Sequence, residues 1–571
     1  MLKKSLTISL LLGVVFSVAV FVWYSPVIFK GYSPGAMTSE VMIAFNYANY
    51  GVYGYEDKMN IVVAPELVKE RAVESSAGNK FGIISYSLLF KWFGWLDWNQ
   101  LVLFSAIAYS LAAAIFALLV YFSFGLLAAI IFAAVYILLP FNWGNVHFLG
   151  FYEFTMIYFS LFSIFYFSVQ NQKGKTNYYF LIVSGIFLAL ACLSREAILV
   201  FLPVLFFWLF LKKKKKQLLA VFVPLGLLLA VFWVPGMLGI KGSNDYLNLF
   251  TNKNSQAEKH SDFNYYLLAY RDPYTFHFNH QEVNQQIDRA ISQKNGEFIY
   301  QISQMKGGAN MGIRQVTLKE RLLVGTSNLI KHLSRFFALE EIGGPLVFMA
   351  VIAGFWALKK RDPSLARFFF FWLLGVPIIL SYVVLAVRSH LIDYGWVIAL
   401  LAALGLISAR SLLKDYYHAG KYANWLFILL IGLFVYNLIL ADHVYWGRAY
   451  DSDVNLAMNY LSVKIKSYPK LIAPEEVIAV GNSLMHPTMS YLTGKSVVFF
   501  HPDTIIKLVN EKNLQSAFDK FNVKYIIGYD ASTTDLIIKN SQATNISSWP
   551  ESKDLVRPMS YSQRWFLNLI K

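Results

Sequence analysis

The chain has 571 residues, of which 57% are hydrophobic, and it carries a formal net charge of +16. Its mean hydropathy is +0.47, more apolar than a soluble core of this size requires, so the composition favours an integral membrane protein. The basic residues stand in short clusters between apolar runs, as helix-flanking charge does, which argues against a nucleic-acid partner. The single cysteine, Cys192, lies inside an apolar run, so neither an internal disulfide nor a thiolate metal cluster is expected.

Apolar runs long enough for membrane helices recur along the chain. A bilayer core of roughly 30 Å takes about 20 apolar residues per helix. The first run follows two lysines, yet it is longer than the apolar part of a secretory signal and no small-residue cleavage site follows, so we expect it to be retained. About eleven spans are predicted, near residues 6–29, 99–121, 124–140, 151–169, 178–193, 197–211, 217–237, 343–358, 368–387, 391–409 and 424–441.

The distribution of lysine and arginine predicts the orientation of these spans. With a cytoplasmic N-terminus, the inner segments hold sixteen basic residues, including the run 212–216, whereas the short outer loops hold only Arg195 and Arg388. Basic residues are retained on the cytoplasmic side of a membrane. We therefore expect the segments at about 30–98 and 238–342 and the C-terminal tail to lie outside.

The tail differs in texture from the rest of the chain. The runs "EEVIAV", "SVVFF" and "VKYIIGY" are β-branched and aromatic, and "TIIKLVNEKNLQSAFDKFN" between them has a helical pattern. We predict a transmembrane module over residues 1–441 and a small extracytoplasmic α/β domain over residues 442–571. The fold class is thus a polytopic α-helical membrane protein with a C-terminal α/β domain.

The stretch "MTSEVMIAFNYANYG", which follows the first span, places a carboxylate where a membrane helix ends. Helical spacing puts Glu40 on one face with Ile43, Ala44 and Tyr47, which predicts a helix along the outer membrane surface with Glu40 at its N-terminal end. One interpretation is a charge that complements the helix dipole. The other is a general base or a metal ligand at the membrane boundary.

Four further charged residues are candidates on the same side of the membrane. Lys80 opens the amphipathic run "KFGIISYSLLFKWFG" and either extends to the interface or binds phosphate. Glu153 stands at the start of a span, where an ionisable group is costly and indicates either a function or a buried partner, for which Arg195 is the nearest choice. Arg388 lies in the outer loop between the ninth and tenth spans.

Several classes of catalytic sequence are missing. The chain contains no Gly-x-Ser-x-Gly, Walker or dinucleotide-binding sequence. This argues against a hydrolase triad, an ATP-driven pump and an enzyme that uses nucleotide sugars.

Five segments, in this order, resemble the GT-C superfamily of membrane glycosyltransferases, in particular the bacterial branch that is similar to protein mannosyltransferases and to lipid A aminoarabinose transferases. The likeness covers nearly the whole chain, and its specificity lies in the order of the segments. They are Glu40 followed by "IAFNYANYGVYG", then "KFGIISYSLLFKWFG", "YEFTMIYFSLFSIFYF", "LALACLSREAILVFLPVLFFWLF" and "RSHLIDYGWVIALLAALGL".

This resemblance implies an enzyme of the bacterial inner membrane. Its donor would be a sugar linked to a polyprenyl phosphate, and its acceptor an envelope glycan, lipid or protein. Glu40 would act as the base, and Lys80, Glu153, Arg195 and Arg388 would bind the substrates. The resemblance leaves the need for a divalent metal ion open.

Two other functions remain as alternatives. One is an O-antigen polymerase or ligase, which also uses lipid-linked sugars in the membrane but is not expected to carry an α/β tail. The other is a non-catalytic protein of polysaccharide export or envelope assembly. Transporters tend to show internal repeats and broken helices, neither of which the sequence indicates.

Overall fold

The computed structural model describes residues 38–551, apart from residues 58, 60, 74–79, 141–151, 171–176, 238–279, 295–315, 339–341, 385–393, 416–421, 451–452 and 482–485. The chain divides into two compact units. Unit 1 comprises Met1–Lys30, Val102–Val231 and Lys319–Ala449, and unit 2 comprises Gly31–Leu101, Phe232–Leu318 and Tyr450–Lys571.

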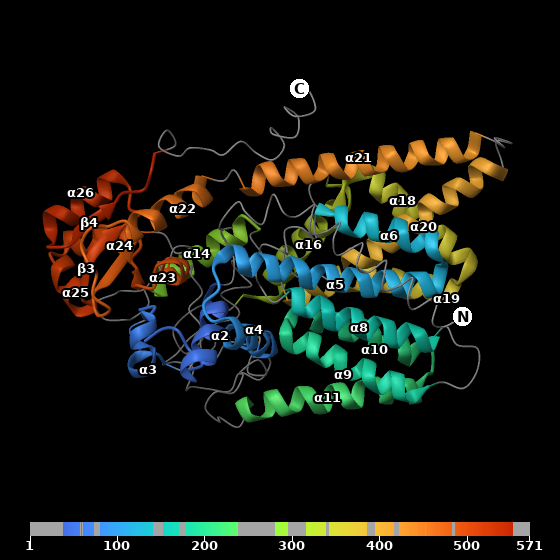
Figure 1. The fold of residues 1–571 in the computed structure, drawn as a ribbon, viewed down its shortest axis with the longest axis horizontal. Coiled ribbons are helices and arrows are strands. Elements are labelled where there is room, and N and C mark those ends of the chain that lie inside the picture. Colours follow the sequence, from blue (N-terminus) through green and yellow to red (C-terminus); the bar gives the residue numbers. More distant parts are fainter. Residues whose placement is uncertain are drawn as a thin grey trace. The chain divides into compact units, whose positions relative to one another are not determined.

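The described elements of unit 1 are all helices (Figure 1). Six helices of the described chain are long and apolar enough to cross a membrane, and four shorter apolar helices accompany them. The elements that lie wholly or mainly in unit 1 are α5 (Trp98–Phe124), α6 (Leu126–Leu138), α8 (Tyr152–Gln170), α9 (Tyr178–Ser194), η2 (Glu196–Val200), α10 (Phe201–Leu211), α11 (Lys215–Met237), α16 (Leu318–Ser334), η4 (Arg335–Phe337), α18 (Gly344–Arg361), α19 (Pro363–Ile379), η5 (Leu380–Val384), α20 (Tyr394–Asp415) and α21 (Tyr422–Tyr450).

The predicted spans agree with these helices. All those from residue 99 onward are helical over most of their length, and the first, at 6–29, lies outside the described residues. The span predicted at 368–387 changes character near its end, because α19 contains Pro377 and continues as the π-helical turn η5. Proline lacks the amide hydrogen that the α-helical ladder needs, so the hydrogen-bond pattern changes there.

Two helices of unit 1 approach each other very closely at glycines. A Cβ atom added to Gly354 of α18 would lie 1.7 Å from the carbonyl oxygen of Leu401 in α20, and one added to Gly405 of α20 would lie 2.0 Å from that of Ala350. Small residues let helix backbones meet where lipid supplies no hydrophobic driving force between helices. This crossing therefore depends on the two glycines.

An aromatic cluster joins α8, α10, α19 and α20. The ring of Phe201 lies 4.3 Å from that of Trp372, and Trp372 lies 5.6 Å from Trp396. The hydroxyl of Tyr394 donates to the carbonyl oxygen of Trp372 at 3.1 Å. Ring contacts of this kind add to the stability that burial gives, so the cluster joins these helices in the core of unit 1.

Unit 2 combines short helices from two earlier segments of the chain with an α/β tail (Figure 1). The sheet has the order β2-β1-β3-β4 and all its strands are parallel. The elements are α2 (Thr38–Tyr50), η1 (Pro65–Leu67), α3 (Val68–Arg71), α4 (Lys80–Phe93), α14 (His280–Ser292), α22 (Asp453–Lys466), β1 (Val477–Val480), α23 (His486–Thr493), β2 (Ser496–Phe499), α24 (Pro502–Asn510), α25 (Leu514–Phe521), β3 (Val523–Ile527), α26 (Ala531–Asn540) and β4 (Thr544–Ser547).

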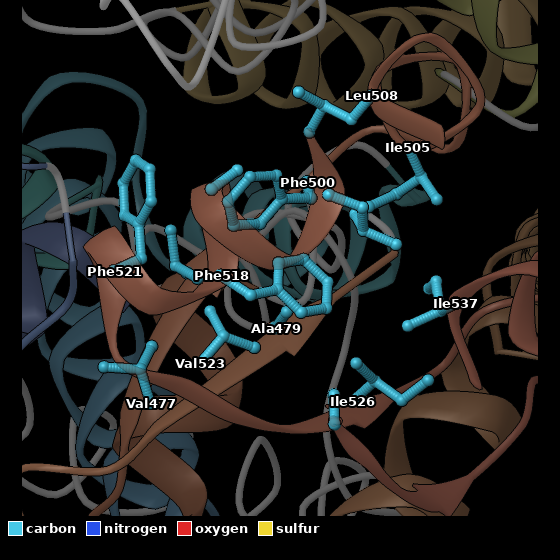
Figure 2. Packing of buried hydrophobic residues seen from close by; sticks show 14 of the residues in the cluster. Val477, Ala479, Phe500, Ile505, Leu508, Phe518, Phe521, Val523, Ile526 and Ile537 are labelled. Atoms are coloured by element: carbon cyan, nitrogen blue, oxygen red, sulfur yellow. The ribbon is translucent and has the colours of Figure 1, made fainter. Parts of the chain in front are cut away.

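The core of the tail lies between the sheet and helices α24, α25 and α26. Val477 and Ile526 of the strands meet Leu508, Phe518 and other apolar residues of these helices, and all of them are buried (Figure 2). The predicted α/β fold of the tail is thereby confirmed. The helical pattern predicted over 504–522 forms two helices, with Lys512 between them in the left-handed region at φ 57°.

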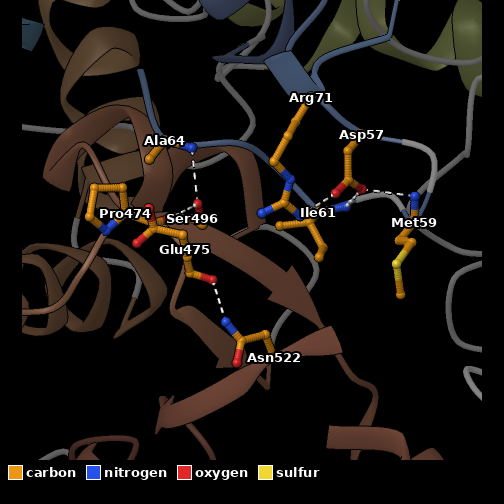
Figure 3. A network of polar contacts seen from close by, with 9 residues as sticks. All are labelled: Asp57, Met59, Ile61, Ala64, Arg71, Pro474, Glu475, Ser496 and Asn522. Carbon is orange, nitrogen blue, oxygen red and sulfur yellow. Dashed lines mark hydrogen bonds and ion pairs between the residues drawn. The ribbon is translucent and has the colours of Figure 1, made fainter. Parts of the chain in front are cut away.

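The segment that follows α2 pairs with the edge of this sheet. Val62 forms an antiparallel bridge with Val497 of β2, with two backbone hydrogen bonds of 2.9 and 3.0 Å. The amide of Ala64 donates to Ser496 Oγ at 3.1 Å, and Ser496 Oγ donates to the carbonyl of Pro474 at 2.9 Å (Figure 3). The open edge of β2 is thus covered by a segment more than 400 residues earlier in the chain.

The side chain of Asp57 fixes the backbone of this segment. The Oδ1 atom of Asp57 accepts from the amides of Met59 and Ile61 at 2.8 and 3.1 Å. Its Oδ2 atom forms an ion pair of 2.6 Å with Arg71 (Figure 3). A buried carboxylate with several donors holds its loop in one conformation, and the residues that pair with β2 follow directly.

Candidate functional site

Glu40 lies in the first turn of α2. The helix predicted after the first span is therefore present, with the carboxylate at its N-terminal end. The side chain is half-buried, and Ser39 Oγ donates a hydrogen bond of 2.6 Å to its Oε2 atom. A carboxylate in this position meets both the helix dipole and the unsatisfied amides of the first turn.

The rest of α2 is firmly held. Residues 41–46 are all buried, and Asn46 Nδ2 donates to the carbonyl of Gly54 at 2.8 Å. The ring of Phe45 packs edge-on against Phe90 of α4 at 5.4 Å. Helix α4, which begins at Lys80, packs against α2. The structure thus brings together the two helices that carry Glu40 and Lys80.

Arg195 lies where α9 ends and η2 begins. Its backbone is extended there, with φ −152° and ψ 121°. Its Nη2 atom donates to the hydroxyl of Tyr152 at 3.1 Å, and its Cζ atom lies 4.5 Å from the centroid of the same ring. The start of α8 and the end of α9 are therefore joined through a buried guanidinium.

The environment of this guanidinium explains how it is tolerated. Only 4% of Arg195 is exposed, and 1% of the adjacent Glu153. A buried cation is costly in an apolar bundle, and both the face of an aromatic ring and a hydroxyl acceptor lower that cost. Arg195 and Glu153 lie at neighbouring helix ends, and their direct pairing stays a prediction. A guanidinium held in one orientation can recognise phosphate oxygens through its planar fork.

Two features of unit 1 escaped the sequence analysis. Tyr152, the partner of Arg195, reads in the sequence as one of many aromatic residues. Asn328 and His332 of α16 are buried, and Thr326 Oγ1 lies 3.1 Å from the hydroxyl of Tyr382 in η5. A polar pair four residues apart lies on one face of a helix, and this spacing is a signal that could have found the face.

The predicted site residues lie in different parts of the chain. Arg388 lies outside the described residues. Glu40 and Lys80 belong to unit 2, and Glu153 and Arg195 to unit 1. Within the described part of the chain, no three His, Cys, Asp or Glu residues gather as a metal site would require.

The fold is similar to those of solved structures. No protein-family model and no curated protein matches the chain. Among solved structures, the oligosaccharyltransferase of Archaeoglobus fulgidus in complex with zinc and sulfate is similar, with a TM-score of 0.54 at 16% identity over 91% of this chain and 67% of that chain. The chain has the GT-C fold. A further similar structure is apo ArnT from Cupriavidus metallidurans, with a TM-score of 0.47 at 13% identity over 85% of each chain. The expected fold class, a GT-C-like α-helical membrane protein with an α/β tail, is confirmed.

Proposed function

We propose that this GT-C chain is an integral membrane glycosyltransferase, which moves a sugar from a polyprenyl-phosphate donor to an envelope glycan, lipid or protein on the outer face of the bacterial inner membrane. The observation that carries the proposal is the half-buried Glu40 carboxylate in the first turn of α2, in a chain with this fold. A lipid-linked donor also accounts for a sequence without a nucleotide-binding motif.

In the proposed reaction, Glu40 takes the proton of the acceptor hydroxyl. The acceptor oxygen forms a bond with the anomeric carbon of the sugar, and the bond from that carbon to the phosphate oxygen breaks, with inversion of configuration. The polyprenyl phosphate leaves with the electron pair, and cationic side chains stabilise its charge. Arg195, Arg388 and Lys80 are the proposed phosphate ligands, and Glu153 is the proposed partner that orients them.

The decisive variant is Glu40→Gln, which keeps the shape of the side chain but cannot accept a proton. Purified protein in nanodiscs is supplied with undecaprenyl phosphate carrying a panel of radiolabelled hexoses and pentoses. If Glu40 is the base, undecaprenyl phosphate binding is retained and transfer falls by roughly 10² to 10⁴. A helix-end charge alone would cost about 0.3–1 kcal/mol of stability and leave turnover unchanged.

A matched control is Glu66→Gln, because Glu66 is an exposed carboxylate in the first turn of η1 in the same unit. We expect this variant to transfer sugar at the wild-type rate. Wild-type turnover in Glu40→Gln would remove Glu40 from catalysis and make Glu153 the next carboxylate to test. Wild-type protein that transfers no sugar from any donor would favour the export or assembly function.

The phosphate site has its own test at Arg388. Arg388→Lys keeps the charge but loses the planar fork, so we expect weaker undecaprenyl phosphate binding. Unchanged affinity in both Arg388→Lys and Arg388→Ala would exclude this residue from the site. Transfer measured with EDTA and after readdition of Mg²⁺ or Mn²⁺ decides the metal requirement.

The proposed orientation rests on the charge asymmetry and on the helix ends. Arg361, at the end of α18, donates to the carbonyl of Ser123 near the end of α5 at 2.7 Å, so two helix ends predicted to be cytoplasmic meet. Reporter fusions after Lys216 and after Arg361 should report the cytoplasm, and fusions after Gly242 and after Asp451 should report the outside. An external signal after Lys216 would invalidate this topology.

A further inference from the structure

A row of three aromatic rings connects the tail to the helix that carries Glu40. Tyr491 of α23 stacks on Trp95 with 4.4 Å between the ring centroids and 24° between the planes. Trp95 meets Phe45 of α2 edge-on at 4.6 Å. Helix α23 also packs directly against α2. The tail therefore contacts α2 both through helix packing and through Trp95.

Tyr491 adds a hydrogen bond to this row. It is 1% exposed, and its hydroxyl donates to the carbonyl of Leu96 at 2.5 Å. Burial, with a smaller contribution from the charge of Asp97, raises the pKa of Tyr491 far above its ordinary value, so the hydroxyl remains a donor at every physiological pH. The residue fixes both the backbone after α4 and the ring of Trp95.

A second connection lies at the sheet edge. The bridge between Val62 and Val497 and the bond from Ala64 to Ser496 hold the segment after α2 against β2. The tail thus contacts the chain both before α4, at Val62 and Ala64, and after α4, at Trp95 and Leu96. Because residues 41–46 of α2 are all buried, a movement of this packing would move the first turn of α2 as well.

We propose that the C-terminal α/β domain is a positioning domain for Glu40. The stacked and edge-on contacts of Tyr491, Trp95 and Phe45 fix α2 against this domain. Tyr491 is a positioning residue, since it acts on the carboxylate only through these neighbours. The inference rests on the proposed function where it assigns catalysis to Glu40. It assigns the domain a mechanical role in place of sugar or nucleotide binding.

The test compares three variants of the full-length protein in nanodiscs. Tyr491→Leu removes the stack and the hydrogen bond, and Tyr491→Phe removes only the hydrogen bond. The matched control is Tyr529→Phe, because Tyr529 is also 1% exposed and donates to a backbone carbonyl, that of Phe500, at 3.1 Å, but inside the core of the tail. The first readout is hydrogen–deuterium exchange of the α2 amides, which needs no activity.

We expect exchange of the α2 amides to rise about tenfold in Tyr491→Leu, less in Tyr491→Phe, and not at all in Tyr529→Phe. If Tyr491→Leu also loses protection in β1 and β3, the tail has unfolded and Tyr491→Phe decides. Two combinations would overturn the inference. In both, the α2 amides of Tyr491→Phe exchange at the wild-type rate, and in Tyr491→Leu either the α2 amides also exchange at the wild-type rate or the tail is unfolded.

The second readout is turnover. Small displacements of a catalytic group lower rates steeply, so we expect kcat to fall about tenfold or more in Tyr491→Leu while undecaprenyl phosphate binding stays within about twofold of wild type. Faster exchange of α2 with unchanged kcat would overturn the positioning role. If the wild-type protein transfers no sugar, the proposed function fails, and the exchange experiment still decides whether the tail orders α2.

Discussion

The contact between Tyr152 and Arg195 gives a quantitative prediction. Tyr152→Phe keeps the ring that lies 4.5 Å from Arg195 Cζ and removes only the hydroxyl that accepts from Nη2 at 3.1 Å. A hydrogen bond to a charged group contributes about 1.5–3 kcal/mol. Since 3.1 Å exceeds the usual charge-assisted length of about 2.7–2.9 Å, we expect the lower part of that range, about 1.5–2 kcal/mol of unfolding free energy.

The same helix offers a matched control. Tyr166 of α8 is 1% exposed, and its hydroxyl has no hydrogen-bond partner in the described part of the chain. Tyr166→Phe should therefore be neutral or slightly stabilising. Unfolding of both variants in mixed micelles titrated with SDS measures the difference, and binding of undecaprenyl phosphate reports whether Arg195 has lost its orientation. Equal unfolding free energies for the two variants would refute the account of Tyr152.

Two further predictions concern stability. Gly354→Ala places a methyl group against the carbonyl of Leu401, so it should destabilise the bundle by about 1–3 kcal/mol. Gly432→Ala in α21 should not destabilise it, because a Cβ atom there has no neighbour within 4 Å. Equal SDS unfolding curves for the two variants would contradict this. In the tail, desolvation raises the pKa of Asp530, but hydrogen bonds from Ser532 and Thr533 outweigh it and lower the pKa from 3.8 to about 2. A carboxyl whose pKa is lowered by folding stabilises the folded state at pH values above its unfolded pKa of 3.8, and this contribution is lost as the pH falls to about 2. Thermal stability should therefore fall over this pH range, and Asp530→Asn should reduce the pH dependence.

The helices from residue 99 onward and the main strands could be predicted because each depends on local pattern. An apolar run of about 20 residues is a helix in lipid whatever its neighbours are. Buried parallel strands read as short β-branched runs, which identified the segments of β1, β2 and β3. Strand β4 (Thr544–Ser547) escaped because it is a polar edge strand, "TNIS", whose residues are half-buried or exposed.

The candidate site was only partly predictable. Glu40 stood out because a carboxylate follows a predicted membrane span, and Arg195 because it is one of few basic residues in the loops predicted to lie outside. Nothing in the pattern marked Tyr152 as the partner of Arg195, 43 positions away, or Tyr491 as the partner of Trp95. Aromatic residues fill 17% of this chain, so the identity of one contacting ring is lost among many similar ones.

The sequence by itself determined that the chain is a helical membrane protein, because hydropathy and span length depend on the solvent and not on which helices meet. It also determined that the tail is an α/β domain. Only the tertiary structure decided that Val62 closes the edge of β2, that Gly354 and Gly405 face each other, and that the tail packs against the helix of Glu40. Periodicity records that a face is buried, whereas the partner of that face is fixed by shape and by backbone hydrogen bonds between distant segments.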